Sequence, residues 1–425
     1  MECKESTNVL LKGMTNGYLL PQKDISVVIY HSIHEVNGDW DAAAPEHNLF
    51  LQKKYLQILE DNPPVNVHFV YMLYYKKSKP VGVAIGQVGN FSADKSINDS
   101  NEPEEKKNPC PFSVITNFIK SFVAKKVDIT AFVCGNALLT GESHNICFRE
   151  GEVSEEEEYH ILNDTMKFVQ KELDKKGIHI SLTYLKEYHH RQRPQAQKIL
   201  VEKNRFHEFT AQPNMILDFR EDWNNFDDYL AAMSSKYRVR VKRAFKKGLE
   251  IEKRELSIQD IEENLDRIYD LYLRIAEGSV FNLVKLNPRY FVALKESLGD
   301  DFRMMGYYIE GELAAFFTTI KNYHELEAHF LGYDEIFNRA HQMYLNILYD
   351  IIKIGFEQKC KSIVFARTAL EIKSSVGAEP HEMYWYLRHR NKISNRFLSQ
   401  IVDYLNPKDD WVQRRPFKDQ AKESE

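Results

Sequence analysis

The stretch from residue 302 to residue 375 constrains the fold of this chain most, because strand and helix signals alternate along it. Two apolar and aromatic runs flank Glu310-Gly311, which is a turn pair, so they predict a β-hairpin. A third extended run ends at Tyr333, and a long segment, roughly residues 339–357, is apolar on nearly all of its helical faces. A short apolar run and a polar segment follow. This order predicts an α+β fold with its functional loop between the third strand and the helix.

The first half of the chain repeats this order. Residues 67–88 hold another hairpin signal, with Tyr-Tyr before the turn and small residues after it, as in residues 304–320. Ser154, followed three residues later by Glu157, is a capping box that starts a helix ending near residue 175. Each hairpin is followed by a strand, a long helix, a short strand, a polar helix and a last strand. The parallel predicts two copies of one fold, each a mixed, mostly antiparallel sheet flanked by helices.

Length supports more than one domain, since a chain of 425 residues exceeds the usual size of a single core. Residues 90–111 are polar and poor in large apolar side chains, which is typical of an exposed, mobile insertion. The last strands of the two domains are expected at residues 205–219 and 382–388. The expected organisation is an N-terminal extension (1–24), a first domain (25–220) with the insertion (90–111), a basic linker helix region (221–255), a second domain (256–405) and a loosely held tail (406–425).

Composition and motifs exclude several classes of function. The net charge of −5 gives no case for general nucleic-acid binding, so any basic site must be local. The five cysteines are scattered without CxxC spacing, which fits reduced thiols in the cytoplasm. The N-terminus lacks the apolar core of a signal peptide, and no run approaches the ~18 apolar residues of a membrane span. The motifs of phosphate loops, dinucleotide folds, zinc sites and nucleophile elbows are absent, so no metal and no permanently bound cofactor is expected.

A strand end that faces a helix start carries the best candidates for chemistry. Glu327 and His329 alternate along one strand face, and either side chain can deprotonate an amine. The alternative is a solvated strand face or one satisfied within the core. The following loop, residues 334–339, and the start of the next helix offer backbone N–H groups suited to an anionic donor, although many helix starts bind nothing.

Three charged side chains follow the last buried strand of this segment. They are Arg367, Glu371 and Lys373. The end of a strand is a common ligand position in sheets flanked by helices, so all three are candidate substrate-binding residues, and Arg367 and Lys373 can hold an anionic part of a donor or acceptor. The alternative is an ordinary charged helix surface.

A predicted helix between the two domains has a strongly basic face. That face includes Lys236, Arg240 and Arg243. It can hold anionic lipid headgroups, the phosphates of a substrate or a nucleic acid, and the alternative is a solvated face whose apolar stripe packs on a domain.

These residues resemble the GNAT acyltransferase fold as it occurs in the FemAB-like group, the peptidoglycan-bridge aminoacyltransferases and their relatives. The resemblance lies in SSKYRVRVKRAFKKG, in the hairpin that turns at Glu310-Gly311, in AHFLGYDEIFNRAHQMYLNILYDIIKIGFEQKC, and in FARTALEIKSSVGAEP, where a strand end leads to a lysine and then Gly-Ala. The first copy resembles a second domain of this kind, with CGNALLTGESH at its centre. The resemblance covers most of the chain, is strongest over residues 234–380, and implies tandem GNAT domains.

The resemblance also implies a site. Such folds splay two strands so that the donor carbonyl lies between them against backbone N–H groups. The splayed strand corresponds to residues 326–333 and the donor loop to residues 334–342. The implied donor-binding residues are Gly332, Tyr333, Asn338, Arg339 and Gln342. Acetyl-CoA enzymes carry further glycines in this loop, but no glycine follows Gly332 within it here. Acyl-CoA, acyl carrier protein and aminoacyl-tRNA therefore all stay open as donors.

Transfer of an acyl or aminoacyl group to an amine is the activity that the resemblance implies. Our first hypothesis is an N-acyltransferase that uses acyl-CoA or acyl carrier protein, acts on a lipid-like or cell-envelope precursor by direct attack with a general base, and has its active site in the second copy. The alternative is a peptidoglycan-bridge aminoacyltransferase that uses aminoacyl-tRNA. A third hypothesis is a non-catalytic adaptor that binds a lipid or precursor. We expect a cytoplasmic protein that can lie on the anionic inner face of the membrane, with a nucleic-acid partner only if tRNA is the donor.

Overall fold

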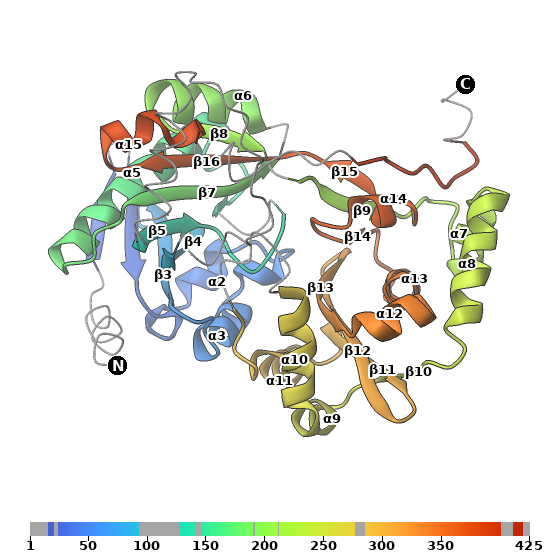
Figure 1. Ribbon diagram of the computed structural model, residues 1–425. Helices are drawn as coiled ribbons and strands as arrows, with labels where there is room; N and C mark the ends of the chain where they lie inside the picture. Colours follow the sequence, from blue (N-terminus) through green and yellow to red (C-terminus); the bar gives the residue numbers. More distant parts are fainter. Residues whose placement is uncertain are drawn as a thin grey trace, which may run out of the picture.

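Two mixed β-sheets organise the chain, and helices flank both of them (Figure 1). The computed structural model describes residues 16–20, 24–92, 128–141, 146–189, 192–210, 212–276, 285–400 and 411–419. Within these residues, no helix has the length and apolar composition that a membrane crossing requires. The α+β class predicted from the sequence is confirmed.

The first sheet has the strand order β1-β2-β3-β4-β5-β7-β16-β8, with β6 beside β4. Its neighbouring strands are antiparallel except for the parallel pair β5 and β7. The strands are β1 (Asn16–Leu19), β2 (Ile25–Tyr30), β3 (Val67–Lys76), β4 (Lys79–Ser92), β5 (Asp128–Cys134), β6 (Ile146–Phe148), β7 (Leu182–His189), β8 (His207–Thr210) and β16 (Met383–His389).

The second sheet has the strand order β10-β11-β12-β13-β14-β9-β15, and here β13 and β14 form the parallel pair. The strands are β9 (Asn214–Asp218), β10 (Glu252–Glu255), β11 (Phe302–Ile309), β12 (Glu312–Asn322), β13 (Glu325–Tyr333), β14 (Ser362–Val364) and β15 (Glu379–His381). The hairpin of β11 and β12 turns at Glu310 and Gly311, both at positive φ, as the sequence predicts.

Both sheets are built with the same connectivity. An antiparallel series ends in one strand of a parallel pair, and a long helix precedes the other strand of that pair. This helix is α5 (Glu155–Lys175) in the first half, where the capping box of Ser154 and Glu157 is present, and α13 (Met343–Glu357) in the second. One further strand then adds in antiparallel fashion, β16 beside β7 and β9 beside β14. The predicted duplication of one fold is confirmed.

The added strands are exchanged between the halves, which the sequence did not predict. Figure 1 shows β9, from the first half, beside β14, and β16, from the end of the second half, beside β7. The segment expected as one bent strand, residues 205–219, is therefore two strands in different sheets, and the strand expected at residues 382–388 belongs to the first sheet. Burial favours the exchange. On β9, Met215 is buried in the apolar cluster that packs on the second sheet, and on β16, Tyr386 is buried in a cluster that packs on the first sheet.

The remaining helices cover the sheets and join the halves. They are α2 (Asp39–Ala43), α3 (Lys53–Asp61), α6 (Arg193–Ala196), α7 (Phe226–Ala232), α8 (Ser235–Lys247), α9 (Ile258–Glu263), α10 (Leu265–Ala276), α11 (Tyr290–Leu298), α12 (Glu335–His341), α14 (Leu370–Ser374) and α15 (Lys392–Arg396), with the 3₁₀ turns η1 (Ile33–Glu35), η2 (Leu49–Leu51) and η7 (Gly299–Asp301) and the π-helix η6 (Gln197–Lys203).

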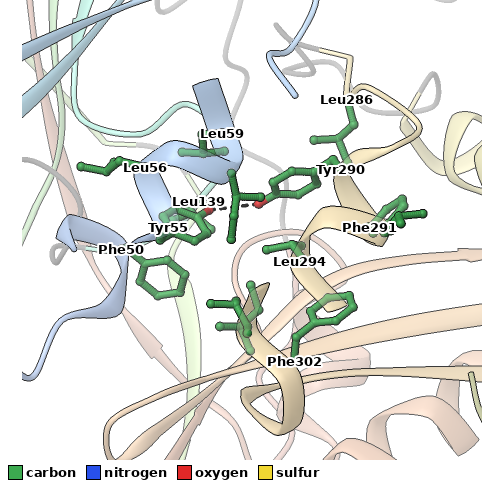
Figure 2. Packing of buried hydrophobic residues seen from close by; sticks show 14 of the residues in the cluster. Phe50, Tyr55, Leu56, Leu59, Leu139, Leu286, Tyr290, Phe291, Leu294 and Phe302 are labelled. Carbon is green, nitrogen blue, oxygen red and sulfur yellow. Dashed lines mark hydrogen bonds between the residues drawn. The ribbon is translucent and has the colours of Figure 1, made fainter. Parts of the chain in front are cut away.

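One apolar cluster continues from the first half into the second. Figure 2 shows α3 and α11 facing each other, with Leu56 and Leu59 on one side and Leu294 on the other. The hydroxyls of Tyr55 and Tyr290 lie 3.0 Å apart at the centre of this contact. Because this shared core excludes water, it fixes the two sheets relative to each other.

The tail expected to be loosely held from residue 406 is ordered over residues 411–419. Phe417 is 2% exposed, and its backbone forms an isolated bridge with Met233. The amide of Ser234 donates to the carbonyl of Pro416 over 2.9 Å. Burial of this aromatic ring overrides the polar composition of the tail. Three predicted segments lie wholly or mostly outside the described residues: the rest of the tail, the insertion after Ser92, and most of the N-terminal extension.

Candidate active site

The parallel strands of the second sheet pair over a short distance and then part. Glu325, Leu326 and Glu327 of β13 pair with β14, and the pairing ends there, although β13 continues to Tyr333. Beyond Val364 the chain turns to β9 instead. We call this opening between β13 and the chain after β14 the split. The backbone of β13 along the split has no partner strand on that side among the described residues.

A β-bulge lies in β13 at the split. Thr318 of β12 stands opposite two residues, His329 and Phe330, where the register of the pair shifts. The hydroxyl of Thr318 accepts from the amide of Phe330 over 2.9 Å and donates to its carbonyl over 3.0 Å. A bulge re-aims the side chains that it carries, so His329 need not follow the alternation predicted for the strand.

Glu327 stands where the pairing ends. Its side chain is 6% exposed, and the described residues offer its carboxyl no ion pair. Burial raises the pKa of Glu327 well above its usual range, and the charges of Glu325 and Glu187 raise it further. The carboxyl is therefore held toward its neutral, protonated form.

His329 belongs to a hydrogen-bonded chain that crosses between the halves. Its Nε2 lies 3.0 Å from the hydroxyl of Tyr290, which in turn lies 3.0 Å from the hydroxyl of Tyr55. Burial raises the pKa of Tyr290 well above its usual range, so this hydroxyl keeps its proton. The contact fixes the orientation of the imidazole ring.

The loop after β14 is strained and is held by a buried lysine. Ala366, Thr368 and Ala369 have φ of 59°, 70° and 48°, values that non-glycine residues rarely adopt. The Nζ of Lys373 donates to the carbonyls of Ala366 and Arg367 over 3.3 and 2.5 Å. Burial, with a smaller effect of the Arg367 charge, lowers the pKa of Lys373 to about 7. Lys373 therefore positions this loop.

Arg367 meets residues of the first sheet. Its guanidinium lies 3.4 Å from the carboxyl of Glu187 and stacks 4.8 Å above the ring of Trp385. Sequence reasoning missed Glu187. The signal was present, because Lys186-Glu187 interrupts the apolar and aromatic residues of LTYLKEY, but the pattern did not show what the pair would contact.

A helix occupies the predicted donor loop. α12 begins at Glu335, and the carboxyl of Asp334 accepts from the amide of Ile336 over 3.1 Å. The side chain of Asn338 accepts from the amide of Tyr344 at the start of α13 over 3.0 Å. The segment predicted as a loop for a donor anion is thus largely helical, and these two amides already have partners.

The other residues expected to bind the donor are spread over α12 and its surroundings. Arg339 is exposed and pairs with Glu335 over 3.1 Å, and Gln342, at φ 50°, joins α12 to α13. A Cβ on Gly332 would lie 2.5 Å from the backbone of Leu271, so this glycine allows α10 to pack closely on β13. Tyr333 is half-buried near Tyr344. Gly332 and Tyr333 therefore lie on β13 along the split, whereas Asn338 and Arg339 lie on α12 and Gln342 follows it.

Two of the remaining candidates line one cleft. Arg240 of α8 and Glu371 of α14 face an open cleft of about 390 Å³, together with Gln212, Ala369, Leu370, Ile372 and Trp411. Lys236 and Arg243 are exposed and do not line this cleft. Within the described residues, neither Arg240 nor these two side chains form an ion pair. Of these three, Arg240 is therefore the cation that lies beside the loop after β14.

Comparison with known proteins supports one domain of the chain directly. Residues 235–380 match the family profile described as "Acetyltransferase (GNAT) domain". The match begins at α8 and ends before β16, the strand that lies in the first sheet. No curated protein matches the chain.

Several solved structures match the chain at low sequence identity. FemX is 11% identical, with 88% of this chain and 99% of that chain covered and a TM-score of 0.48. A tandem GNAT protein from the clavulanic acid biosynthesis pathway is 10% identical, with 86% and 99% covered and a TM-score of 0.48. L-PGS from Bacillus licheniformis is 12% identical, with 83% and 96% covered and a TM-score of 0.42. These values carry no substrate over to this chain.

Proposed function

Because residues 235–380 form a GNAT acetyltransferase domain, which makes the chain an acyltransferase, we propose that it moves an acyl group from a thioester donor to an amine. The donor is acyl-CoA or an acyl carrier protein, and the acceptor is a lipid-like or cell-envelope precursor. The observation that carries this proposal is the split, where β13 leaves β14 after Glu327. Peptide groups along the open edge of a strand can hold the donor carbonyl and stabilise the negative charge that develops on its oxygen.

The side chains at the split suit direct attack by an amine. The amine nitrogen bonds to the carbonyl carbon, and its proton passes to His329, whose ring is oriented by Tyr290. The carbon–sulfur bond then breaks, and the thiolate takes the proton of Glu327, the group held toward its neutral form by burial. This division of roles replaces the open choice between Glu327 and His329 as the base.

Because α12 is a folded helix capped by Asp334, its start is a poor place for the anionic part of the donor. An anion at this place would meet the carboxylate of Asp334, which already caps the helix and pairs with Arg274 over 3.0 Å. We therefore assign the anionic part of the donor to the cleft that Arg240 lines, beside the loop after β14. Such a grip suits the phosphopantetheine arm that CoA and acyl carrier protein share.

A second candidate is transfer from aminoacyl-tRNA. The exposed basic face of α8 favours it, because Lys236 and Arg243 form no ion pair within the described ranges and can bind backbone phosphates. The same face supports an anionic membrane surface as a partner, since Val239, 55% exposed, lies between these cations on the helix. Sedimentation with anionic and neutral vesicles tests the membrane partner, and equal binding to both would remove it.

The experiment for the reaction offers the purified chain a long-chain acyl-CoA, the same acyl group on acyl carrier protein, and aminoacyl-tRNA, each with a long-chain amino base or a wall precursor. Mass spectrometry detects the amide product. We expect product from a thioester donor, and a loss of about 10²–10⁴-fold in His329→Ala. His324→Ala, an exposed histidine just before β13, is the matched control.

Each result separates the hypotheses. Product from aminoacyl-tRNA alone supports the second candidate. Full activity in both His329→Ala and Glu327→Gln would show that the reaction takes place elsewhere. A protein that binds the precursor but yields no amide with any donor would be the adaptor.

A further inference from the structure

A bulge in β7 turns two consecutive charged side chains into the protein. Leu185 of β7 pairs with Tyr386 of β16, and Tyr188 pairs with Tyr384. Lys186 and Glu187 therefore both stand opposite one residue of β16, Trp385. Glu187 has φ 56°, an uncommon conformation for a residue with a side chain. Lys186 is 4% exposed and Glu187 is fully buried. Strain of this kind persists where the surroundings hold it, and it concentrates at functional sites.

The buried carboxylate of Glu187 is heavily supported. Its Oε2 lies 2.6 Å from the Nζ of Lys186 and accepts from the amide of Gly141 over 2.6 Å. Its Oε1 faces the second half, where the guanidinium of Arg367 lies 3.4 Å away. Burial alone would raise the pKa of Glu187, but the charges of Lys186 and Arg367 outweigh burial and lower it. The interior therefore holds a carboxylate anion between the two sheets.

Arg367 is held from two sides and still has donors to offer. Glu187 engages one edge of the guanidinium, and Trp385 of β16 lies against its face at 4.8 Å. The side chain keeps 22% of its surface exposed, and Glu187 is its only charged partner among the described residues. A guanidinium has five N–H donors in a rigid fork, so an arginine fixed in this way can bind an oxyanion with the donors that remain.

The position of this arginine relates it to the split. Arg367 follows Val364, where the pairing of β13 and β14 ends, by three residues. The carboxyls of Glu187 and Glu327 are both buried, and the charge of Glu187 helps to raise the pKa of Glu327. A substrate whose carbonyl lies in the split would thus bring a neighbouring anionic group toward Arg367.

We infer that Glu187 is a positioning residue supplied by the first half: it fixes Arg367 so that the free guanidinium donors bind an oxyanion of the substrate, a phosphate ester or a carboxylate, beside the split. This inference rests on the proposed function for the identity of the substrate, while the oxyanion site itself stands on the contacts above. Both groups that hold Arg367 lie in the first sheet, Glu187 on β7 and Trp385 on β16, so the second sheet alone would lack them.

The test is calorimetric titration of the full chain with pyrophosphate and with succinate, which separate a phosphate site from a carboxylate site. Glu187→Gln should weaken binding of the preferred anion by about tenfold, since a charge-assisted contact is lost. Glu187→Asp keeps the charge and should recover part of it. Glu208→Gln is the matched control, because Glu208 pairs with Arg193 at 2.9 Å in the same sheet and Arg193 likewise lies over an aromatic ring, that of Tyr384.

A double-mutant cycle shows whether Glu187 acts through Arg367. Arg367→Lys should weaken binding, and adding Glu187→Gln to it should cause no further loss. Independent, multiplying losses would overturn the inference, as would unchanged binding in Glu187→Gln or no binding of either anion to the wild type. If Glu187→Gln does not fold, Lys186→Met with Glu187→Gln removes the buried pair together and answers the same question.

Failure of this inference differs from failure of the proposed function. If the wild type forms the amide, and Glu187→Gln forms it at the same rate and binds the anion equally well, the inference is overturned and the proposed function stands. Anion binding that depends on Glu187 and Arg367, in a protein that forms no amide with any donor, would support the oxyanion site and overturn the transfer reaction.

Discussion

Replacing Lys373 by methionine should change how the stability of the protein depends on pH. The Nζ of Lys373 is buried and bonds two backbone carbonyls, and its pKa falls from 10.5 to about 7. Between these pH values the folded chain releases a proton that the unfolded chain retains. The free energy of unfolding of the wild type therefore rises with pH across this window, through this one group.

The magnitude follows from the two pKa values. The slope is at most about 1.4 kcal/mol for each pH unit, so the wild type gains roughly 2 kcal/mol between pH 7.5 and pH 9 from this lysine. Lys373→Met lacks this gain. Near neutral pH the variant loses two hydrogen bonds of about 1.5–3 kcal/mol each, but it is also relieved of a buried charge, and these effects oppose each other. The two proteins should be close in stability near pH 7 and diverge above it.

Urea unfolding of both proteins at pH 7.5 and pH 9 measures the effect. Lys186, whose pKa burial lowers to about 8, contributes equally to both proteins and cancels in the comparison. Lys361→Met, an exposed lysine just before β14, is the control and should differ from the wild type by the same amount at both pH values. A stability difference between the wild type and Lys373→Met that does not change with pH would refute the reasoning.

Three further predictions concern the split and its supports. Glu327→Gln should match the stability of the wild type at pH 5 and exceed it increasingly at higher pH, because a raised carboxyl pKa removes stability as pH rises; thermal melts at pH 5 and 8 that keep a constant gap would contradict this. Tyr290→Phe should lose about 1–3 kcal/mol and alter the acidic limb of the pH–rate profile, where the general base His329 loses its proton, since His329 loses its hydroxyl partner; an unchanged profile would separate this tyrosine from catalysis. Gly332→Ala should destabilise the protein by about 1–3 kcal/mol in denaturant, because a methyl group would press on the backbone of Leu271; wild-type stability would mean that α10 can move away.

The sequence was most informative where the signal is local. The hairpin at Glu310 and Gly311 and the capping box at Ser154 and Glu157 each depend on a few neighbouring residues, and both are present. The duplication was predictable because it repeats a whole order of such local signals. The parting of the strands after Glu327 came from the resemblance, since periodicity alone does not show where a pair of strands separates.

Contacts between residues far apart in the chain could not be predicted from local sequence patterns. The alternation of apolar and polar residues along β9 would suit either sheet, so it does not show which strand β9 pairs with. β9 pairs with β14 in the second sheet, where Met215 is buried. Glu187 gains its importance from a bulge and from Arg367, 180 positions later. α12 was read as a loop, although Asp334 before Glu335 is a helix-start signal. The tail is polar in composition, so nothing in its sequence indicated that the rings of Trp411 and Phe417 pack against the core of the second sheet.

The exchange of β9 and β16 makes the two halves interdependent. A protease cut in the linker between residues 220 and 256 would leave β9 on the N-terminal fragment and β16 on the C-terminal fragment, each with its partner strands on the other. The fragments should therefore remain associated, and neither should survive purification alone. For the same reason, a gene fusion that replaced only residues 235–380 by a homologous domain would require that domain to pair its counterpart of β14 with β9 of this chain, so these halves are expected to be inherited as one unit.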